Sequence, residues 1–463
     1  MDTSENKNSD ARNSFGDGLA PRPPSSEDLV KEVSGATSTI KKETLLEEGE
    51  DYIKKLGPGI ITGAADDDPS GIATYSQAGA QFGPNLLWLS VWTLPLIITV
   101  QEMCARIALV TGNGLAANIK HSYKKELLYF VTIVLLIANI FNIGANLGAM
   151  ATAFQLITPG VSFTFLIIAI GIVCLTLPVI IPYKKYARYL KWLVITLFSY
   201  IITGFIIHMD WGNLLDHSLI PHITFSKSQI LLITAILGTT ISPYLFFWET
   251  SQEVEEEIAE GKTTVHSRRG TNKIEIKKMR RDIWTGMFLS NLVMFFIIAV
   301  CANTLFVNGV HDIDTASDAA LALLPFAGSF ATVLFAIGII GTGMLAVPVL
   351  ASSTSYAISE SFGWKEGLYR RFKKARAFYT IIIISILIGI LINFIGIHPI
   401  KALIYSAITN GIISPIILIF IVHISSNEKI MGYHKNSKSQ KIVGWLTIGL
   451  MSITAIAAII SLF

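Results

Sequence analysis

The chain has little charge and little cysteine for its length. Only 15% of its 463 residues are charged and 52% are hydrophobic, a composition far from that of a soluble enzyme. The three cysteines, Cys104, Cys174 and Cys301, all fall inside long apolar runs, so no disulfide framework is expected. The N-terminal segment also lacks a basic region followed by an apolar one, so we expect no cleavable signal peptide.

Apolar runs of about 20 residues recur along the chain, each long enough to cross roughly 30 Å of hydrocarbon. They follow a segment rich in Ser, Glu and Lys, residues 1–50, which we expect to be a disordered cytoplasmic tail. Eleven runs occur, at about 57–80, 86–112, 127–155, 162–183, 187–209, 229–248, 283–307, 328–357, 376–396, 401–424 and 441–462. The sequence therefore predicts an all-α membrane protein with a transmembrane transporter domain over residues 51–463.

Basic residues are concentrated in alternate loops. Counting the spans in chain order, the loops 2–3, 4–5, 6–7, 8–9 and 10–11, with the span ends beside them, hold 25 Lys or Arg. The other loops hold two, Lys227 and Lys401. By the positive-inside rule, the N-terminus is predicted to be cytoplasmic, and an odd number of spans places the C-terminus outside. We expect a multi-pass protein of the plasma membrane.

One inner loop, residues 249–282, is much longer than the others and changes sign along its length. It begins with acidic residues such as Glu253 and Glu257 and ends with basic ones such as Arg280 and Arg281. The plainest interpretation is a solvated helical extension that helps to set the topology. A regulatory or lipid-headgroup role is the alternative.

Three adjacent carboxylates interrupt the first apolar run, in the sequence GAADDDPSG at residues 63–71. An ionised carboxylate near the centre of a bilayer costs several kcal/mol, so it is retained only where it faces a partner, water or an ion. Asp68 and Pro69 also suit the start of a resumed helix, but a helix cap needs only Ser or Asn and no charge. We therefore expect a functional role for at least one of the three aspartates, Asp68 first.

A second run is interrupted in a similar way, at residues 239–244 (TTISPY). Two broken helices at corresponding positions of two halves are the best sequence indication of a transporter's substrate site. The two halves, about 55–210 and about 228–425, each contain an odd number of spans, so the second must insert upside down. This predicts a 5+5 inverted repeat with broken helices 1 and 6, and an extra helix at about 441–462.

The groups at the two breaks form a set of oxygen ligands. Backbone carbonyls near Ala65, the Asp68 carboxylate and the hydroxyls of Thr239, Thr240 and Ser242 are all expected to face the gap. Oxygen ligands suit hard cations such as Mg²⁺, Ca²⁺ or Mn²⁺. No Cys, Met or His occurs at either break to favour a softer metal.

These motifs resemble those of the Nramp divalent-metal transporters. The shared elements are GPG at 57–59, DPSG at 68–71 and QAG at 77–79 in the first span, Gln101, Arg106 and VTG at 110–112 in the second, and Met431-Gly432 in the last inner loop. The resemblance covers roughly residues 55–460. It implies the LeuT-type inverted-repeat fold, with the metal held between helices 1 and 6.

The chain departs from the family's pattern at its metal-selecting positions. The family's metal-binding Asn is Gly71 here, its thioether-bearing Met is Ser242, and its proton-route His is Tyr244. Its acidic pair in the third span aligns with Asn142 and Ala145. This pattern is similar to the Nramp-related magnesium transporters, and the loss of bulk and of sulfur would make room for a hydrated Mg²⁺.

The resemblance and the chemistry together predict a set of site residues. The predicted metal ligands are Asp68, Ala65, Gly71, Thr239 and Ser242, with Asp66, Asp67, Thr240 and Tyr244 as accessory residues. Asp66 and Asp67 would raise the local cation concentration at the mouth of the site. Two other polar pairs are expected to be structural: Glu102 with Arg106, which are spaced to pair on one helix, and Asn142 with Asn146, which are expected to hold helices together.

The predicted function is transport of Mg²⁺, and of Mn²⁺, by alternating access without proton coupling. Divalent metal ions and membrane lipids are the expected partners, with no nucleic acid and no cofactor. A proton-coupled Mn²⁺/Fe²⁺ importer is the alternative, which Ser242 and Tyr244 disfavour. An organic-solute carrier would have to bind a substrate carboxylate, which the three aspartates at the break would repel. A non-transporting receptor would not explain why charges lie at a helix break. The sequence shows no nucleophile–base pair and no metal-ligand spacing, so we do not expect an enzyme.

Overall fold

Two membrane-length helices are each broken into two halves. In the computed structural model, which describes residues 57–181 and 198–462, the first broken helix consists of α2 (Pro58–Asp66) and α3 (Pro69–Phe82). The second consists of α11 (Lys227–Thr240) and α12 (Pro243–Ala259). A proline begins α3 and α12, where its missing amide proton and fixed φ suit the first helical position. Both predicted breaks are confirmed.

The other long helices follow the predicted apolar runs. They are α4 (Trp88–Thr111), α6 (Lys125–Ile157), α7 (Phe163–Ile180), α14 (Lys273–Cys301), α17 (Ala331–Phe362), α18 (Arg376–Ile392), α19 (Pro399–Ser426) and α21 (Lys438–Leu462). Within the described ranges, eight helices are long and apolar enough to span a membrane, α11 and α12 counting as one. The α2–α3 pair and α18 complete all but the predicted fifth span, whose described part is α9 (Phe198–Ile206). The predicted tail, residues 1–50, lies outside the described residues.

Shorter helices connect these spans. They are α5 (Leu115–Ser122), α10 (Trp211–Leu219), α13 (Val265–Arg268), α15 (Ala316–Ala320), α16 (Leu324–Ala327) and α20 (Glu428–Met431). The helix α14 continues without interruption into a π-helical turn at Ala302–Phe306, so the seventh span ends close to its predicted end.

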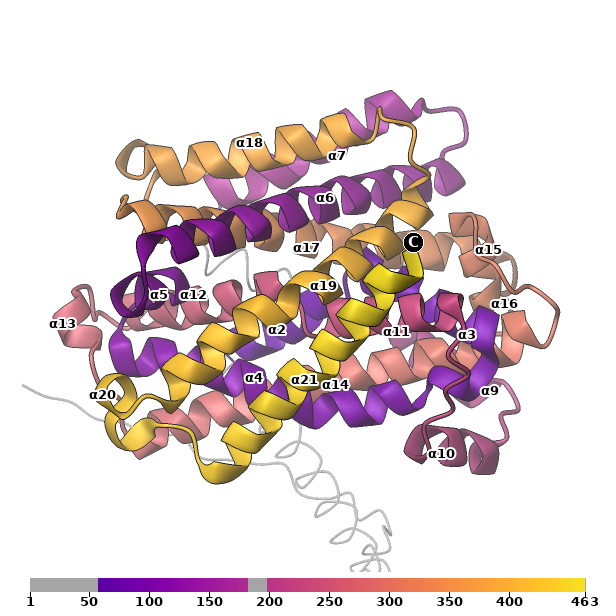
Figure 1. The fold of residues 1–463 in the computed structure, drawn as a ribbon. Helices are drawn as coiled ribbons and strands as arrows, with labels where there is room; N and C mark the ends of the chain where they lie inside the picture. The colour runs from indigo at the N-terminus through magenta and orange to yellow at the C-terminus, as the bar shows by residue number, and fades with distance from the viewer. Residues whose placement is uncertain (1–56, 182–197, 463) are drawn as a thin grey trace, which may run out of the picture. The chain divides into compact units, whose positions relative to one another are not determined.

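The long helices pack around the two broken helices in three sets. Helices α6, α7, α17 and α18 pack against one another, at the top in Figure 1, whereas α4 and α14 pack with α2 and α12. Helices α19 and α21 run beside each other and cover α11. This is the predicted all-α, LeuT-type inverted repeat with one additional helix.

A glycine contact brings α2 against α14. A Cβ atom added at Gly286 would lie 2.1 Å from the carbonyl oxygen of Gly59, and one added at Gly63 would lie 2.4 Å from the carbonyl oxygen of Gly286. Small residues of this kind let helix backbones approach closely in a membrane. The half-helix that carries the three aspartates is therefore held directly against α14.

The acidic beginning of the long inner loop is not the solvated extension that the sequence indicates. Helix α12 continues to Ala259, and Glu249, Glu253, Glu255 and Glu257 on it are all buried. Glu255, for example, accepts hydrogen bonds from the Tyr356 hydroxyl at 2.6 Å and the Leu368 amide at 2.8 Å. The prediction was wrong because these carboxylates pack between neighbouring helices, which the local charge pattern does not reveal.

The predicted Glu102–Arg106 pair is also not formed as a direct hydrogen bond. Glu102 instead accepts from Arg280 Nε at 3.1 Å and from Gln440 Nε2 at 3.2 Å. Arg106 donates to Gln440 Oε1 at 3.1 Å and to Asn436. Partners from α14 and from the segment around α21 thus take the place of the neighbour one helical turn away.

Candidate functional site

Asp68 lies at the break in the first helix and caps α3. Its Oδ1 atom accepts hydrogen bonds from the Gly71 amide at 2.9 Å and from Ser70 Oγ at 2.5 Å. The bond from the Gly71 amide is that of an N-cap residue, which satisfies an amide left without a partner at a helix start. The residue is fully buried. The local sequence therefore explains why the carboxylate is held at this point.

The other carboxylate oxygen of Asp68 faces α6. Its Oδ2 atom accepts from Asn146 Nδ2 at 3.0 Å and from Asn142 Nδ2 at 3.3 Å. Asn142 Oδ1 in turn accepts from Ser406 Oγ of α19 at 3.0 Å. The asparagine pair does join helices, but it does so by holding Asp68, a role that the sequence reasoning missed. The one available signal was their spacing of a single helical turn in the middle of a span.

The second break faces the first through threonine hydroxyls. Thr239 Oγ1 is 3.4 Å from Ser70 Oγ, and Thr240 Oγ1 is 3.1 Å from the Tyr75 hydroxyl oxygen. A Cβ atom added at Gly71 would lie 3.3 Å from Thr239 Oγ1. The structure therefore places the predicted residues Asp68, Gly71 and Thr239 next to one another.

Two predicted ligands already have partners within the protein. Ser242 Oγ donates to the carbonyl oxygens of Gly238 and Thr239, both at 2.6 Å, so the hydroxyl is turned back toward the end of α11. The Ala65 carbonyl oxygen accepts a hydrogen bond from the Tyr244 hydroxyl at 2.7 Å. An ion that used the Ala65 oxygen as a ligand would share it with, or take it from, this hydroxyl.

Asp66 and Asp67 face away from the partners of Asp68. Ser290 Oγ of α14 is the donor to both, at 2.6 Å from Asp66 Oδ2 and 3.2 Å from Asp67 Oδ1. Both residues are buried, and Asp66 Oδ1 has no hydrogen-bond partner among the residues that the structure describes. The two carboxylates thus lie in the protein interior against α14 and not at a solvated mouth.

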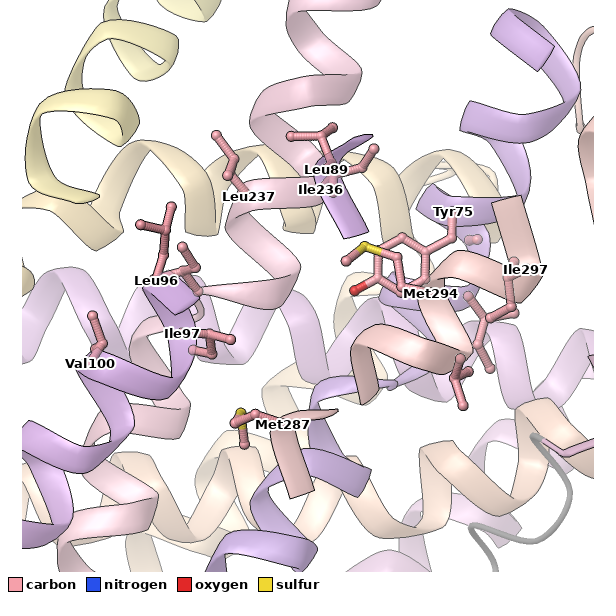
Figure 2. Packing of buried hydrophobic residues seen from close by; sticks show 14 of the residues in the cluster. Tyr75, Leu89, Leu96, Ile97, Val100, Ile236, Leu237, Met287, Met294 and Ile297 are labelled. Carbon is pink, nitrogen blue, oxygen red and sulfur yellow. The ribbon is translucent and has the colours of Figure 1, made fainter. Parts of the chain in front are cut away.

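A methionine reaches the second break from a distant helix. Met294 Sδ of α14 is 4.0 Å from Thr240 Oγ1. Figure 2 shows Met294 with Tyr75 among buried apolar side chains of the core. The sequence around the breaks contains no sulfur, so only the packing of α14 brings a thioether to this side of the site.

Contacts on both sides of the break hold the first helix. Toward its beginning, the Thr62 hydroxyl of α2 donates to Glu249 of α12. Toward its end, Gln77 of α3 donates from Nε2 to the His311 carbonyl at 3.1 Å and accepts from the Ile313 amide at 2.9 Å. Each half-helix is therefore tied to a different part of the second half of the chain.

The geometry limits how an ion could be held. Across the described part of the chain, no three His, Cys, Asp or Glu side chains are grouped so that they could hold a metal ion together. An ion beside Asp68 would have one carboxylate and otherwise amide, hydroxyl, carbonyl and water oxygens. Such a set suits a hard cation that keeps part of its hydration shell.

Comparison with known proteins gives a family match and a shared fold. A family model described as "Natural resistance-associated macrophage protein-like" matches residues 59–461. The divalent metal cation transporter MntH of Klebsiella pneumoniae is 22% identical over 402 residues, 86% of this chain and 91% of that protein. The solved manganese transporter of Eremococcus coleocola superimposes with a TM-score of 0.70 at 17% identity, covering 89% of this chain and 87% of that one. A solved nucleobase-cation-symport-1 family transporter gives a TM-score of 0.54 at 12% identity, over 88% and 91% of the two chains.

Proposed function

Because this chain belongs to the Nramp family, we propose that it transports divalent metal cations across the membrane. The observation that carries the proposal is the Asp68 carboxylate, buried where two broken helices meet. A buried charge at a helix break marks a substrate site in transporters of this architecture. The relative in Klebsiella pneumoniae is itself named as a divalent metal cation transporter. The ion is the substrate, so the proposal requires no cofactor.

The preferred ion is Mg²⁺, with Mn²⁺ also accepted. Mg²⁺ gives up its waters reluctantly and is usually bound by one or two carboxylates with several waters retained. Asp68 supplies one carboxylate, and Gly71 and Ser242 bring neither bulk nor a thioether toward it. The hydroxyls of Ser70 and Thr239 and the amide groups of Asn142 and Asn146 are the neutral side-chain groups that a hydrated ion beside Asp68 would meet.

Binding would require Asp68 to exchange protein donors for the ion. In this conformation Asn146 Nδ2 donates to Asp68, whereas Asn146 Oδ1 has no partner among the described residues. Rotating the amide would replace the donor by an acceptor, because the two ends of an Asn side chain have opposite roles. Asn146 would then present an oxygen to the ion beside the Asp68 carboxylate.

Transport is proposed to be uncoupled from protons. The positions where the family carries its third-span acids and its histidine are Asn142, Ala145 and Tyr244 here, and none of them is a carboxylate or an imidazole. We further propose a plasma-membrane location with the N-terminus inside, in which the membrane potential attracts the ion. At 100 mV that attraction is about 4.6 kcal/mol for a divalent cation.

A proton-coupled Mn²⁺ importer is the second candidate. Met294 is the observation that favours it, since a thioether 4.0 Å from Thr240 could contribute to binding a softer ion. The Eremococcus coleocola structure is also that of a manganese transporter.

Uptake into proteoliposomes tests the proposal. Mg²⁺ and Mn²⁺ uptake would be measured side by side, with and without a pH gradient, for the wild type and for Asp68→Asn. We expect uptake of both ions by the wild type, independent of the pH gradient, and none by the variant. Uptake of Mn²⁺ alone, driven by the pH gradient, would favour the second candidate, and uptake of neither ion would contradict both.

A further inference from the structure

A hollow lined by acidic side chains lies at the beginning of α2, away from the break that carries Asp68. Its volume is about 60 Å³, and one buried water needs roughly 10–15 Å³, so several waters fit. The acidic residues that line it are Glu253, Glu256, Glu257 and Glu260 from α12 and its end, and Glu275 and Asp282 from α14. We call this hollow the acidic vestibule.

Two lysines also line the acidic vestibule and pair with part of it. Lys262 Nζ is 3.1 Å from Glu257 Oε1 and 3.1 Å from Glu275 Oε1. Lys278 Nζ is 3.5 Å from Glu260 Oε1, near the exposed rim. These ion pairs involve Glu257, Glu260 and Glu275, each through one oxygen atom.

Two buried carboxylates of the acidic vestibule have oxygen atoms without a hydrogen-bond partner among the described residues. Glu253 is 7% exposed and makes no hydrogen bond or ion pair within the described residues, although it lines the hollow. Glu257 is 2% exposed, and its Oε2 atom has no hydrogen-bond partner in the same part of the chain. The two residues are four apart on one face of α12, so their charges also repel each other. A buried carboxylate without a partner, such as that of Glu253, is costly as an anion, and a cation in the hollow would supply the missing positive charge.

Hydrogen bonds connect the acidic vestibule to α2, the half-helix that leads to the proposed transport site. Asp282 Oδ2 accepts a hydrogen bond from the Gly59 amide, at 2.6 Å, in the first turn of α2. Helix α2 has nine residues and carries Asp66 at its other end, so the two sites are separated by roughly 12 Å along the helix at 1.5 Å per residue. One turn closer to the break, Glu249 accepts from Thr62 of the same helix.

We propose that the acidic vestibule is a second binding site for a hydrated divalent cation, with Glu253 and Glu257 as its anionic ligands. Carboxylate oxygens are the ligands of hard divalent cations. No three acidic, His or Cys side chains in the described ranges are grouped to hold a metal ion together, so the proposed ion would be held by two carboxylates and by waters, for which the hollow has room. The positive-inside rule predicts that this side is cytoplasmic. The site would therefore take up an ion on the inner side of the membrane.

Mn²⁺ binding to the purified full-length chain tests this site apart from the transport site. Binding would be counted by the loss of the free Mn²⁺ electron paramagnetic resonance signal, in Asp68→Asn as the background. That substitution removes the transport-site charge and keeps the size and capping ability of the residue. We expect one Mn²⁺ site to remain, and Mg²⁺ to compete for it.

Adding Glu253→Gln and Glu257→Gln to this background should weaken the remaining site by about tenfold or more, because two charges next to a divalent ion are lost. Glu428→Gln is the matched control, since Glu428 is an exposed acid paired with Lys435 in another loop on the same predicted side, and binding should not change. If the double substitution impairs folding, Glu253→Gln alone is measured, because this side chain has no described hydrogen bond to lose.

Two results would overturn the proposal: no Mn²⁺ bound in the Asp68→Asn background, or residual binding that the glutamine substitutions leave unchanged. Neither result depends on whether the protein transports Mg²⁺. A failure of the second site is therefore distinguishable from a failure of the proposed function.

Discussion

At the scale of single residues, the decisive feature is how differently three adjacent aspartates are placed. Asp68 has four donors, from its own helix start and from α6, whereas Asp66 and Asp67 share one hydroxyl of α14. The helix break turns consecutive side chains in different directions, so Asp68 faces α6 whereas Asp66 and Asp67 face α14. The Asp68 carboxylate is thereby set apart from the other two, and it is the one that we propose binds the ion.

Asp68→Asn is expected to abolish divalent-cation uptake while leaving a folded protein. Asn is as good an N-cap as Asp, so the start of α3 should be kept, but the charge that attracts the ion is lost. Uptake in proteoliposomes and elution as a single size-exclusion peak would be measured together. Wild-type uptake by a well-folded variant would rule out Asp68 as the principal ligand.

Restoring the family's residues, Ser242→Met together with Gly71→Asn, should tighten Mn²⁺ binding relative to Mg²⁺. The thioether and the amide would add direct ligands and take the room of retained waters. The Asn side chain would fit closely at position 71, because a Cβ atom added there would lie 3.2 Å from the Asp66 carbonyl oxygen. Calorimetric titration of both ions is the measurement. An unchanged Mn²⁺/Mg²⁺ preference in the double variant would refute this explanation of selectivity.

At the scale of helices, the contact between α2 and α14 determines where the aspartates lie. The glycines at this contact let the two backbones approach closely, and Ser290 on α14 then reaches Asp66 and Asp67. The same helix provides Met294 to one side of the site and Asp282 to the start of α2. Helix α14 is thus a support for the whole first half-helix.

Gly286→Ala should destabilise the protein by roughly 1–3 kcal/mol, the usual range for overpacking. The new methyl group would lie 2.1 Å from a backbone oxygen of α2, which cannot yield as a flexible side chain would. Gly449→Ala in α21 is the control, because a Cβ there has nothing within 4 Å. Thermal unfolding of the two variants in the same detergent provides the comparison. Equal melting temperatures would contradict the prediction, because they would mean that the added methyl group at position 286 does not destabilise the contact between α2 and α14.

At the scale of the whole molecule, the two halves of the chain bring their broken helices together in the interior. Most polar side chains that contact Asp68 are neutral, and the nearest carboxylates are those of Asp66 and Asp67, with Glu249 about one helical turn away toward the beginning of α2. Asn142, Ala145 and Tyr244 are neither carboxylates nor imidazoles, and on this ground we propose that the ion carries its charge across the membrane without proton coupling.

Uptake is therefore expected to increase with an inside-negative potential and to leave the internal pH unchanged. Proteoliposomes containing a pH-sensitive dye, with the potential set by a potassium gradient and valinomycin, would report both quantities. Liposomes that contain the Asp68→Asn variant provide the background. Acidification of the interior that accompanies Mg²⁺ entry and depends on the wild-type protein would show that transport is proton-coupled.

Both breaks and the spans that the structure describes could be predicted from the sequence alone, and the sequence also singled out Asp68 as the candidate ligand. Each of these follows from local properties: the length of an apolar run, a proline after a polar residue, and the cost of a charge in lipid. The partners of these residues could not be predicted in this way, because they come from helices far away in the chain. Asn142 and Asn146 lie 74 and 78 residues from Asp68, and Met294 lies 54 residues from Thr240. The same reason explains the burial of Glu253 on α12: whether a charged face meets solvent or another helix is a property of packing and not of the segment that carries it.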